Sequence, residues 1–386
     1  MAETPFLFDE GHELFRDSVR RLAETEFAGG YLERATQDKF PRAECEILAR
    51  NGLLGVLVPE EFGGQGSDAI ALGICLEELA KVDFTLSYLP FAGALAARLI
   101  ALMPDTAVRA KWLEAVASGE SLAALALTEP GAGSHNAGMT CRAVACEGGW
   151  RLEGEKTSMT LAGPADAALV FAKTSPNESH RSIACFLVAD LDDSSIARQT
   201  FVDPGWRPLG RGSVTFDGTF VPEEHLVTPS GGGLSSVLKE FELTRPALAL
   251  MCIGTAETAL RMAGEYAKQR QAFGQPISRF QGVSFVLAEH ETKLEAARWL
   301  CYRSLGLTAA GRPAAKEAAM CKWWVPQIAT QAINDAVVIH GHVGWSDEMP
   351  LMQMLRDVSG LQVGDGTPQI QKLIIARELL GREFTG

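Results

Sequence analysis

Apolar residues recur every three or four positions along the first part of the chain, with charged residues between them. Within the first such segment they are Leu14, Phe15, Val19, Leu22 and Ala23. This spacing predicts an amphipathic helix over residues 6–27. The pattern predicts a further helix from Pro41 and helices over residues 69–81, 90–103 and 111–118. Pro41 and Pro90 each lie in the first turn of the helix that they begin.

The pattern changes near Ser121, where the apolar runs become short, rich in β-forming residues and separated by turns. Gly148-Gly149 and Asp217-Gly218 mark two tight turns. The predicted strands cover residues 122–127, 139–146, 150–154, 167–173, 182–190, 196–201 and 213–221. Several short strands within about a hundred residues indicate a small barrel or sandwich.

Helical spacing returns after a Gly-rich linker at residues 229–233. The predicted helices cover residues 235–269, 279–309, 313–340, 351–357 and 369–380. Pro246 predicts a kink or a helix start within the first of them. The fold class is α+β multidomain, with an N-terminal all-α domain (1–121), a middle β-barrel domain (122–232) and a C-terminal four-helix bundle (233–386).

Composition and charge exclude several classes of partner. Of 386 residues, 47% are hydrophobic and 22% charged, as expected of a soluble globular protein, and the formal net charge is −13. That charge argues against binding nucleic acid or an anionic membrane surface. The start of the chain does not resemble a signal peptide, and no apolar run is long enough for membrane insertion. Eight scattered cysteines without metal-ligand spacing indicate reduced thiols, a cytoplasmic location and no metal site.

The strongest candidate for chemistry is Asp365, which stands between Gly364 and Gly366. Glycines on both sides permit a tight turn and close approach of a ligand, which indicates that the carboxylate faces a ligand. The alternative is an ordinary turn in which Asp365 or Thr367 caps the next helix. A second candidate is the Gly-rich loop at residues 127–134, whose N–H groups and hydroxyls suit phosphate or flavin atoms but also suit an ordinary turn.

Taken in order and spacing, these segments resemble the acyl-CoA dehydrogenase family over essentially the whole chain. The matching segments are residues 59–66, 77–80, 127–134, 154–160, 163–166, 266–274 with Gln281, 340–344, Arg356-Asp357 and 365–371. In that family a Glu-Gly-Thr segment carries the catalytic carboxylate, and Asp365-Gly366-Thr367 occupies its place.

The resemblance implies that Asp365 removes the α-proton of an acyl-CoA thioester while FAD accepts the β-hydride. It implies FAD contacts from Leu125, Leu127, Thr128, Gly133, Ser134, Ser158, Thr160, Arg270, Phe273, Gln281, Val338, Gly341, Thr367 and Gln369. It implies substrate contacts from Ser134, Phe241, Glu242, Arg245, Gly364 and Gly366. Because the family's equivalents of Arg270, Phe273 and Gln281 reach a neighbouring subunit's FAD, it also implies a homotetramer.

Several positions depart from the family pattern. Aspartate replaces the usual glutamate at 365, Gly364 stands where an aromatic residue is common, and Ser158 replaces a tryptophan. Val338 replaces a glutamine, and Thr244 stands where some members carry an alternative catalytic glutamate. Aspartate is shorter by one methylene, and a misplacement of about 1 Å costs roughly 10²-fold in rate.

The shorter base and the loss of bulk at Gly364 and Ser158 favour a cyclic or branched acyl group, oxidised to its 2,3-enoyl-CoA, with electrons passing to an electron-transfer flavoprotein. Two alternatives stay open. One is a flavin oxidase of a small carbon acid, similar to nitroalkane oxidase, and the other is a non-catalytic subunit of an acyl-CoA dehydrogenase complex.

Overall fold

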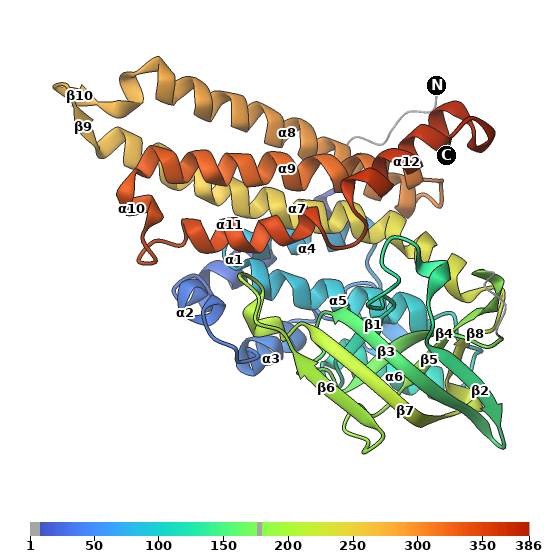
Figure 1. Cartoon of the computed structure of the whole chain (residues 1–386). Helices are drawn as coiled ribbons and strands as arrows, with labels where there is room; N and C mark the ends of the chain where they lie inside the picture. Colours follow the sequence, from blue (N-terminus) through green and yellow to red (C-terminus); the bar gives the residue numbers. More distant parts are fainter. Residues whose placement is uncertain (1–7, 176–179, 386) are drawn as a thin grey trace. The chain divides into compact units, whose positions relative to one another are not determined.

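The computed structural model describes residues 8–175 and 180–385, which form two compact units (Figure 1). The bundle unit comprises Met1–Thr36, Ala69–Tyr88 and Glu242–Gly386, and the sheet unit comprises Gln37–Asp68 and Leu89–Phe241. Residues 6 and 7 of the predicted first helix lie outside the described residues. No helix in the described stretches combines the length and apolarity needed to cross a membrane.

The helices predicted before residue 121 are present. They are α1 (Glu10–Glu26), α3 (Arg42–Arg50), α4 (Ala69–Ala80), α5 (Phe84–Ile100) and α6 (Ala107–Ser118), and a short α2 (Tyr31–Ala35) was not predicted. The predicted start of α5 is wrong, because the carboxylate of Asp83 accepts the N–H of Leu86 at 3.0 Å and starts the helix there. Pro90 therefore lies inside α5, and Pro41 immediately precedes α3.

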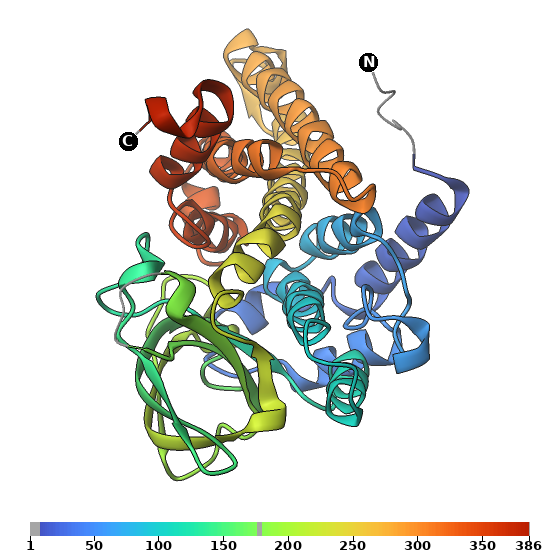
Figure 2. The same cartoon turned by 90° about the vertical axis from the view of Figure 1, so that its right-hand side faces the viewer.

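One mixed sheet forms the core of the sheet unit. Its strands are β1 (Ala123–Ala126), β2 (Arg142–Cys146), β3 (Gly149–Met159), β4 (Ala167–Lys173), β5 (Ile183–Val188), β6 (Ile196–Thr200), β7 (Gly212–Pro222) and β8 (Leu226–Thr228). The pairing order is β6-β7-β3-β2-β4-β5-β8, with β1 parallel to β4. The sheet curves strongly (Figure 2), but β6 and β8 end the pairing path and do not pair with each other among the described residues. The predicted barrel is therefore not confirmed.

Sequence patterning explains which strands are central. Strands β4 and β5 are almost entirely apolar and buried, and they pair antiparallel from Ala168–Val188 to Lys173–Ile183. Strand β3 is longer than predicted, running to Met159, with one register shift between Leu152 and Glu153 and another between Lys156 and Met159. Residues 157–160 lie close to the loop that follows β1. The N–H of Thr157 donates to the Thr128 carbonyl at 2.9 Å, beside the second irregularity.

Helices follow the sheet, namely α7 (Gly233–Gln269), α8 (Gln281–Ala309), α9 (Ala315–His340), α10 (His342–Trp345), α11 (Leu351–Ser359) and α12 (Pro368–Leu380). The bundle unit takes up the chain from Glu242, within α7. Helix α9 packs against α8, α11 and α12 (Figure 1). Helix α7 continues through Pro246 without ending. An unpredicted hairpin, β9 (Gln271–Ala272) and β10 (Gln275–Pro276), joins α7 to α8.

Candidate active site

Asp365 lies in the bundle unit, on a short loop between the 3-10 turn η7 (Gly360–Gln362) and α12. Its backbone is left-handed, with φ of 53°, and Gly366 follows with φ of 93°. A left-handed backbone costs a non-glycine residue roughly 1–2 kcal/mol, although aspartate tolerates it better than most. The surroundings must therefore enforce the shape of this loop.

The Asp365 carboxylate is not used to cap the following helix. The hydroxyl of Thr367 accepts the N–H of Ile370 at 3.5 Å and caps α12, so the Thr367 cap is confirmed and the Asp365 cap is wrong. Neither the carboxylate nor the N–H of Asp365 has a hydrogen-bond partner within residues 8–175 and 180–385. Both groups remain available to a ligand.

Two cations act on the Asp365 carboxylate, Lys322 from α9 and Arg245 from α7. Burial raises the pKa of Asp365 above its ordinary value of 3.8, and the two cations oppose part of the rise. Burial also lowers the pKa of Arg245 to about 10, against the opposing effects of Asp365 and Glu242. A carboxyl group with a raised pKa and no hydrogen-bond partner is suited to act as a general base.

Phe241 and Glu242, which were predicted to contact substrate and precede Arg245 in the chain, are engaged by the protein itself. The Glu242 carboxylate accepts the N–H of Ala314 at 2.9 Å, so Glu242 anchors the start of α9. Phe241 is buried at the end of the sheet unit. Of these three residues, the bundle unit brings Arg245 to act directly on Asp365.

The Gly-rich loop after β1 presents polar groups beside open space. Thr128 and Thr160 are half-buried and Ser134 is exposed, and none of the three hydroxyls has a hydrogen-bond partner in the described part of the chain. A Cβ placed on Gly133 would meet nothing within 4 Å. Leu127 is buried and Leu125 half-buried on β1 and its end, which anchors the loop on the sheet.

The β9–β10 hairpin displays Phe273 at its tip. Phe273 is 96% exposed with φ of 51°, and Gly274 follows with φ of 79°. Arg270 and Gln281 flank the hairpin, and both are exposed. The Arg270 side chain makes no ion pair or hydrogen bond with any residue that the structure describes.

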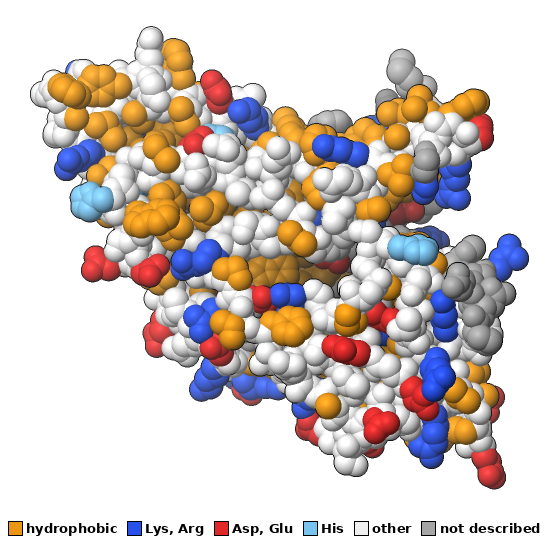
Figure 3. Space-filling view, viewed as in Figure 1, with side chains coloured by type: hydrophobic (Ala, Val, Ile, Leu, Met, Phe, Trp, Pro, Cys, Tyr) orange, Lys and Arg blue, Asp and Glu red, His pale blue; other side chains and the backbone are white. Residues whose placement is uncertain are grey.

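Hydrophobic side chains gather over the end of the bundle unit that carries this hairpin (Figure 3). Phe273 in the hairpin, Val338 on α9 and Trp345 on α10 are all largely exposed. Gly341, which ends α9, and Gln369 on α12 are exposed as well. Large exposed apolar side chains of this kind mark surfaces that another molecule covers.

Known families account for nearly the whole chain. The family models for the N-terminal, middle and C-terminal domains of acyl-CoA dehydrogenase match residues 9–120, 124–219 and 231–380. The chain belongs to the acyl-CoA dehydrogenase family.

Similar proteins support the family over full length. An acyl-CoA dehydrogenase of Bacillus subtilis is 32% identical over 369 residues, covering 95% of this chain and 97% of the relative. The caffeyl-CoA reductase–Etf complex subunit CarC of Acetobacterium woodii is 33% identical over 376 residues, covering 97% and 99%. The structure of butyryl-CoA dehydrogenase from Megasphaera elsdenii superimposes with a TM-score of 0.93 at 28% identity, covering 97% of this chain and 99% of that one.

As a family member, the chain is an FAD-dependent oxidoreductase that acts on an acyl-CoA thioester. Its own residues fit the cofactor, because the hydroxyls of Thr128, Ser134 and Thr160 have no hydrogen-bond partner within residues 8–175 and 180–385, and Gly133 leaves open space beside them. Such groups bind the polar edge of a flavin.

The sequence did not predict the ion pair that supports the Gly-rich loop at residues 127–134 of this acyl-CoA dehydrogenase. Lys156 is fully buried and Glu129 is 3% exposed, and the Lys156 Nζ donates to Glu129 Oε1 at 2.8 Å and to the Leu127 carbonyl at 3.1 Å. Glu129 Oε1 also accepts the N–H of Cys141 at 2.9 Å. Burial alone would raise the pKa of Glu129, but Lys156 and the donated hydrogen bonds outweigh it and hold that pKa below its ordinary value.

Lys322 and Gln371, which support the Asp365 loop, were also missed. Lys322 Nζ donates to the Leu361 carbonyl at 2.6 Å, and Gln371 Nε2 donates to the carbonyls of Asp365 at 3.3 Å and Gly366 at 3.2 Å. The available signal was Lys322 itself, a single charge within the apolar run at residues 318–326.

The space beside Ser158 is less open than its small side chain predicts. Ser158 is exposed, with φ of 56°, near the irregular end of β3. Arg211 Nη1 donates to the Ser158 hydroxyl at 2.7 Å, and Arg211 Nε donates to Asp203 Oδ2 at 2.7 Å. At Gly364, by contrast, an added Cβ would meet only the Gly360 carbonyl, at 3.7 Å. Within 4 Å, an added Cβ at Gly364 would therefore be less obstructed than the Ser158 side chain, which Arg211 contacts.

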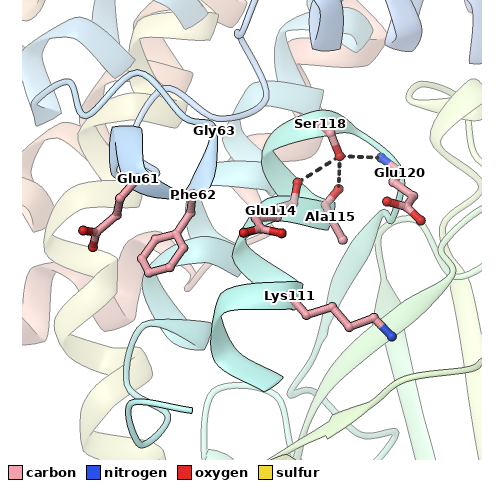
Figure 4. A pocket seen from close by; sticks show the side chains of 8 residues that line it. All are labelled: Glu61, Phe62, Gly63, Lys111, Glu114, Ala115, Ser118 and Glu120. Carbon is pink, nitrogen blue, oxygen red and sulfur yellow. Dashed lines mark hydrogen bonds between the residues drawn. The ribbon is translucent and has the colours of Figure 1, made fainter. Parts of the chain in front are cut away.

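A separate pocket of about 350 Å³ lies in the sheet unit, between η1 (Glu60–Phe62) and α6 (Figure 4). Its lining residues are Glu61, Phe62, Gly63, Lys111, Glu114, Ala115, Ser118 and Glu120. The acidic side chains do not suit the anionic phosphates of FAD or CoA. None of the residues predicted to bind cofactor or substrate lines this pocket.

Proposed function

We propose that this chain oxidises a bulky acyl-CoA thioester to its 2,3-enoyl-CoA, with Asp365 as the base. The observation that carries the proposal is the Asp365 carboxylate, which is half-buried, has a raised pKa and has no hydrogen-bond partner among the described residues. Asp365 takes the α-proton, and FAD supplies the acceptor for the β-hydride. The N–H of Asp365, which has no acceptor among the described residues, is suited to donate to the thioester carbonyl as negative charge develops there.

The test of this function is anaerobic mixing of the flavinated protein with a panel of CoA thioesters. Bleaching of the oxidised flavin by at least one of them, with formation of the enoyl product, is the expected result. A protein that retains FAD but is bleached by none of them would contradict the proposed activity. A chain that retains no FAD would favour the non-catalytic subunit.

The acyl-group preference follows from Gly364, where the chain leaves open space. We expect cyclohexanecarbonyl-CoA to bleach the flavin at least tenfold faster than heptanoyl-CoA, which has the same carbon number. Gly364→Tyr meets no backbone obstacle and should reverse this preference while retaining FAD, because a large side chain fills the space that the ring requires. Rates measured by stopped-flow absorbance check both statements, and an unchanged ratio in the variant would exclude Gly364 as the determinant.

We also propose that the enzyme is a homotetramer in which Arg270, Phe273 and Gln281 contact FAD held by a neighbouring subunit. The support is the almost fully exposed Phe273 on a left-handed backbone, together with Arg270, whose side chain has no partner in the described part of the chain. A lone chain gains nothing from displaying these groups, since both would be stabilised by a covering partner.

Replacing Arg270 with glutamate should therefore weaken FAD retention, because a cation near anionic phosphates becomes an anion. We expect the FAD dissociation constant to rise at least tenfold, measured by ultrafiltration, with unchanged far-UV circular dichroism. Arg312→Glu, at an exposed position after α8, is the matched control and should retain FAD. A fully flavinated monomer in analytical ultracentrifugation would contradict the shared site.

The proposed electron acceptor is an electron-transfer flavoprotein. The support is the relative from Acetobacterium woodii, which is named as a subunit of a caffeyl-CoA reductase–Etf complex. The caffeyl group in that relative's name is an aromatic acyl group, which supports the proposed preference for a bulky acyl group. Reoxidation of the reduced enzyme by such a flavoprotein, faster than by oxygen, is the corresponding measurement.

A further inference from the structure

Lys322 is a charged side chain in a place where charges are rarely found. It is 1% exposed, within α9, and its neighbours along the helix are mostly apolar. Burying an ammonium group is unfavourable unless hydrogen bonds and opposite charge compensate it. Its contacts therefore indicate what the charge is for.

Those contacts lie on both sides of Asp365. Lys322 Nζ donates to the Leu361 carbonyl at 2.6 Å and to the Gly366 carbonyl at 3.4 Å. Gln371 Nε2 donates to the Gly366 carbonyl from the other side, at 3.2 Å. The ammonium thus ties the two ends of the segment from 361 to 366, in which Asp365 and Gly366 are both left-handed. A backbone of this shape persists only where its surroundings hold it.

The charges around Lys322 come from the loop and from α7. Burial lowers the pKa of Lys322 below its ordinary value, and Arg245 acts in the same direction, while the Asp365 carboxylate and the Cys252 thiol offset part of the fall. On the Asp365 side, the same two cations, Lys322 and Arg245, favour the ionised carboxylate against burial. Gln371, on α12, is uncharged, so Lys322 and Arg245 are the cations that compensate Asp365 within the bundle unit.

We propose that Lys322 is a positioning residue for the Asp365 base, which it serves by clamping the carbonyls of Leu361 and Gly366 and by keeping the carboxylate ionised. The inference rests on the proposed function of Asp365. It assigns Lys322 no contact with substrate. Lys322 acts through the loop and through its charge.

The test is Lys322→Met, which retains the length of the side chain but removes the donors and the charge. In the flavinated enzyme we expect the single-turnover rate of flavin reduction to fall at least tenfold, because a base misplaced by about 1 Å loses roughly 10²-fold. We also expect the apparent pKa of the reduction rate to rise, because Asp365 loses a stabilising cation. Lys372→Met, at an exposed position on α12, is the matched control and should change neither.

Lys322→Gln separates the charge from the donors and provides a second variant if Lys322→Met does not fold. It still offers an N–H to the carbonyls, so its apparent pKa should rise as in the Met variant while its rate falls less. An apparent pKa unchanged from wild type in the folded variants would overturn the inference, since a merely structural lysine lowers the rate without moving the pKa. If Asp365→Asn reduces flavin as fast as wild type, the assignment of Asp365 as the base is wrong. If Asp365→Asn is much slower and the Lys322 variants keep the wild-type apparent pKa, only the inference about Lys322 fails.

Discussion

Asp365→Asn is expected to slow flavin reduction by acyl-CoA strongly while leaving FAD in place. Asparagine has the shape of aspartate and also tolerates a left-handed backbone, so the loop with φ of 53° should persist. It cannot accept a proton as a carboxylate does. Since a positioned general base contributes about 10²–10⁴-fold, the single-turnover rate should fall by roughly that factor, measured by stopped-flow bleaching.

The pH dependence provides an independent check on the same variant. In the wild type, the rate should rise with pH through the pKa of Asp365, which lies above 3.8, because only the ionised carboxylate takes a proton. The residual rate of the Asn variant should lack this step. Glu378→Gln, at an exposed position on α12, is the control and should behave as wild type.

Equal bleaching rates in wild type and Asp365→Asn would remove Asp365 from the mechanism. A wild type that is bleached by nitroalkanes but by no CoA thioester would instead favour the carbon-acid oxidase. The acyl-CoA panel and the Asn variant together separate these outcomes.

Lys156→Met is expected to destabilise the sheet unit strongly. The change leaves the Glu129 carboxylate buried without its cation, and removing one partner of a buried pair costs about 3–5 kcal/mol. A loss of 3 kcal/mol lowers the melting temperature of a unit of this size by roughly 6–12 °C. Differential scanning calorimetry measures the shift, and FAD should be released at a lower temperature because Lys156 also holds the Leu127 carbonyl.

The matched control is Arg142→Met, which breaks the ion pair between Arg142 and Glu153 on the neighbouring strands β2 and β3. The side chains of Arg142 and Glu153 are 65% and 42% exposed, and exposed pairs contribute about 0–1 kcal/mol. Its melting temperature should stay close to that of the wild type. Equal shifts in the two variants would mean that burial of the Lys156–Glu129 pair has no special cost.

The stability from this pair should also depend on pH in a defined direction. The pKa of Glu129 in the folded chain lies below its ordinary value, so its contribution is present at neutral pH. It is lost as the pH falls and the carboxylate becomes protonated. In Lys156→Met, the melting temperature should therefore fall less steeply on acidification than in the wild type.

Much of the fold could be predicted because the determining signals are local. Periodic apolar positions placed α1, α4, α8 and α9, and a short apolar run placed β4 at residues 167–173, where the structure has it. Asp365 was found because glycines on both sides are a feature of the local sequence. The start of α5 was missed because the Pro90 signal was given more weight than the Asp83 cap.

What the sequence by itself determined is the family, the order of the elements and the carboxylate that stands at 365. The tertiary structure decided how that carboxylate is held and charged. Lys322 and Arg245 lie far from Asp365 in the chain, and only the packing of α7 and α9 brings their charges to it. The same holds for Arg211, which takes up space beside Ser158, and for the burial of Lys156 against Glu129. Electrostatic and packing interactions depend on distance in space, and a pattern along the chain reports only on residues within a few turns or one strand of each other.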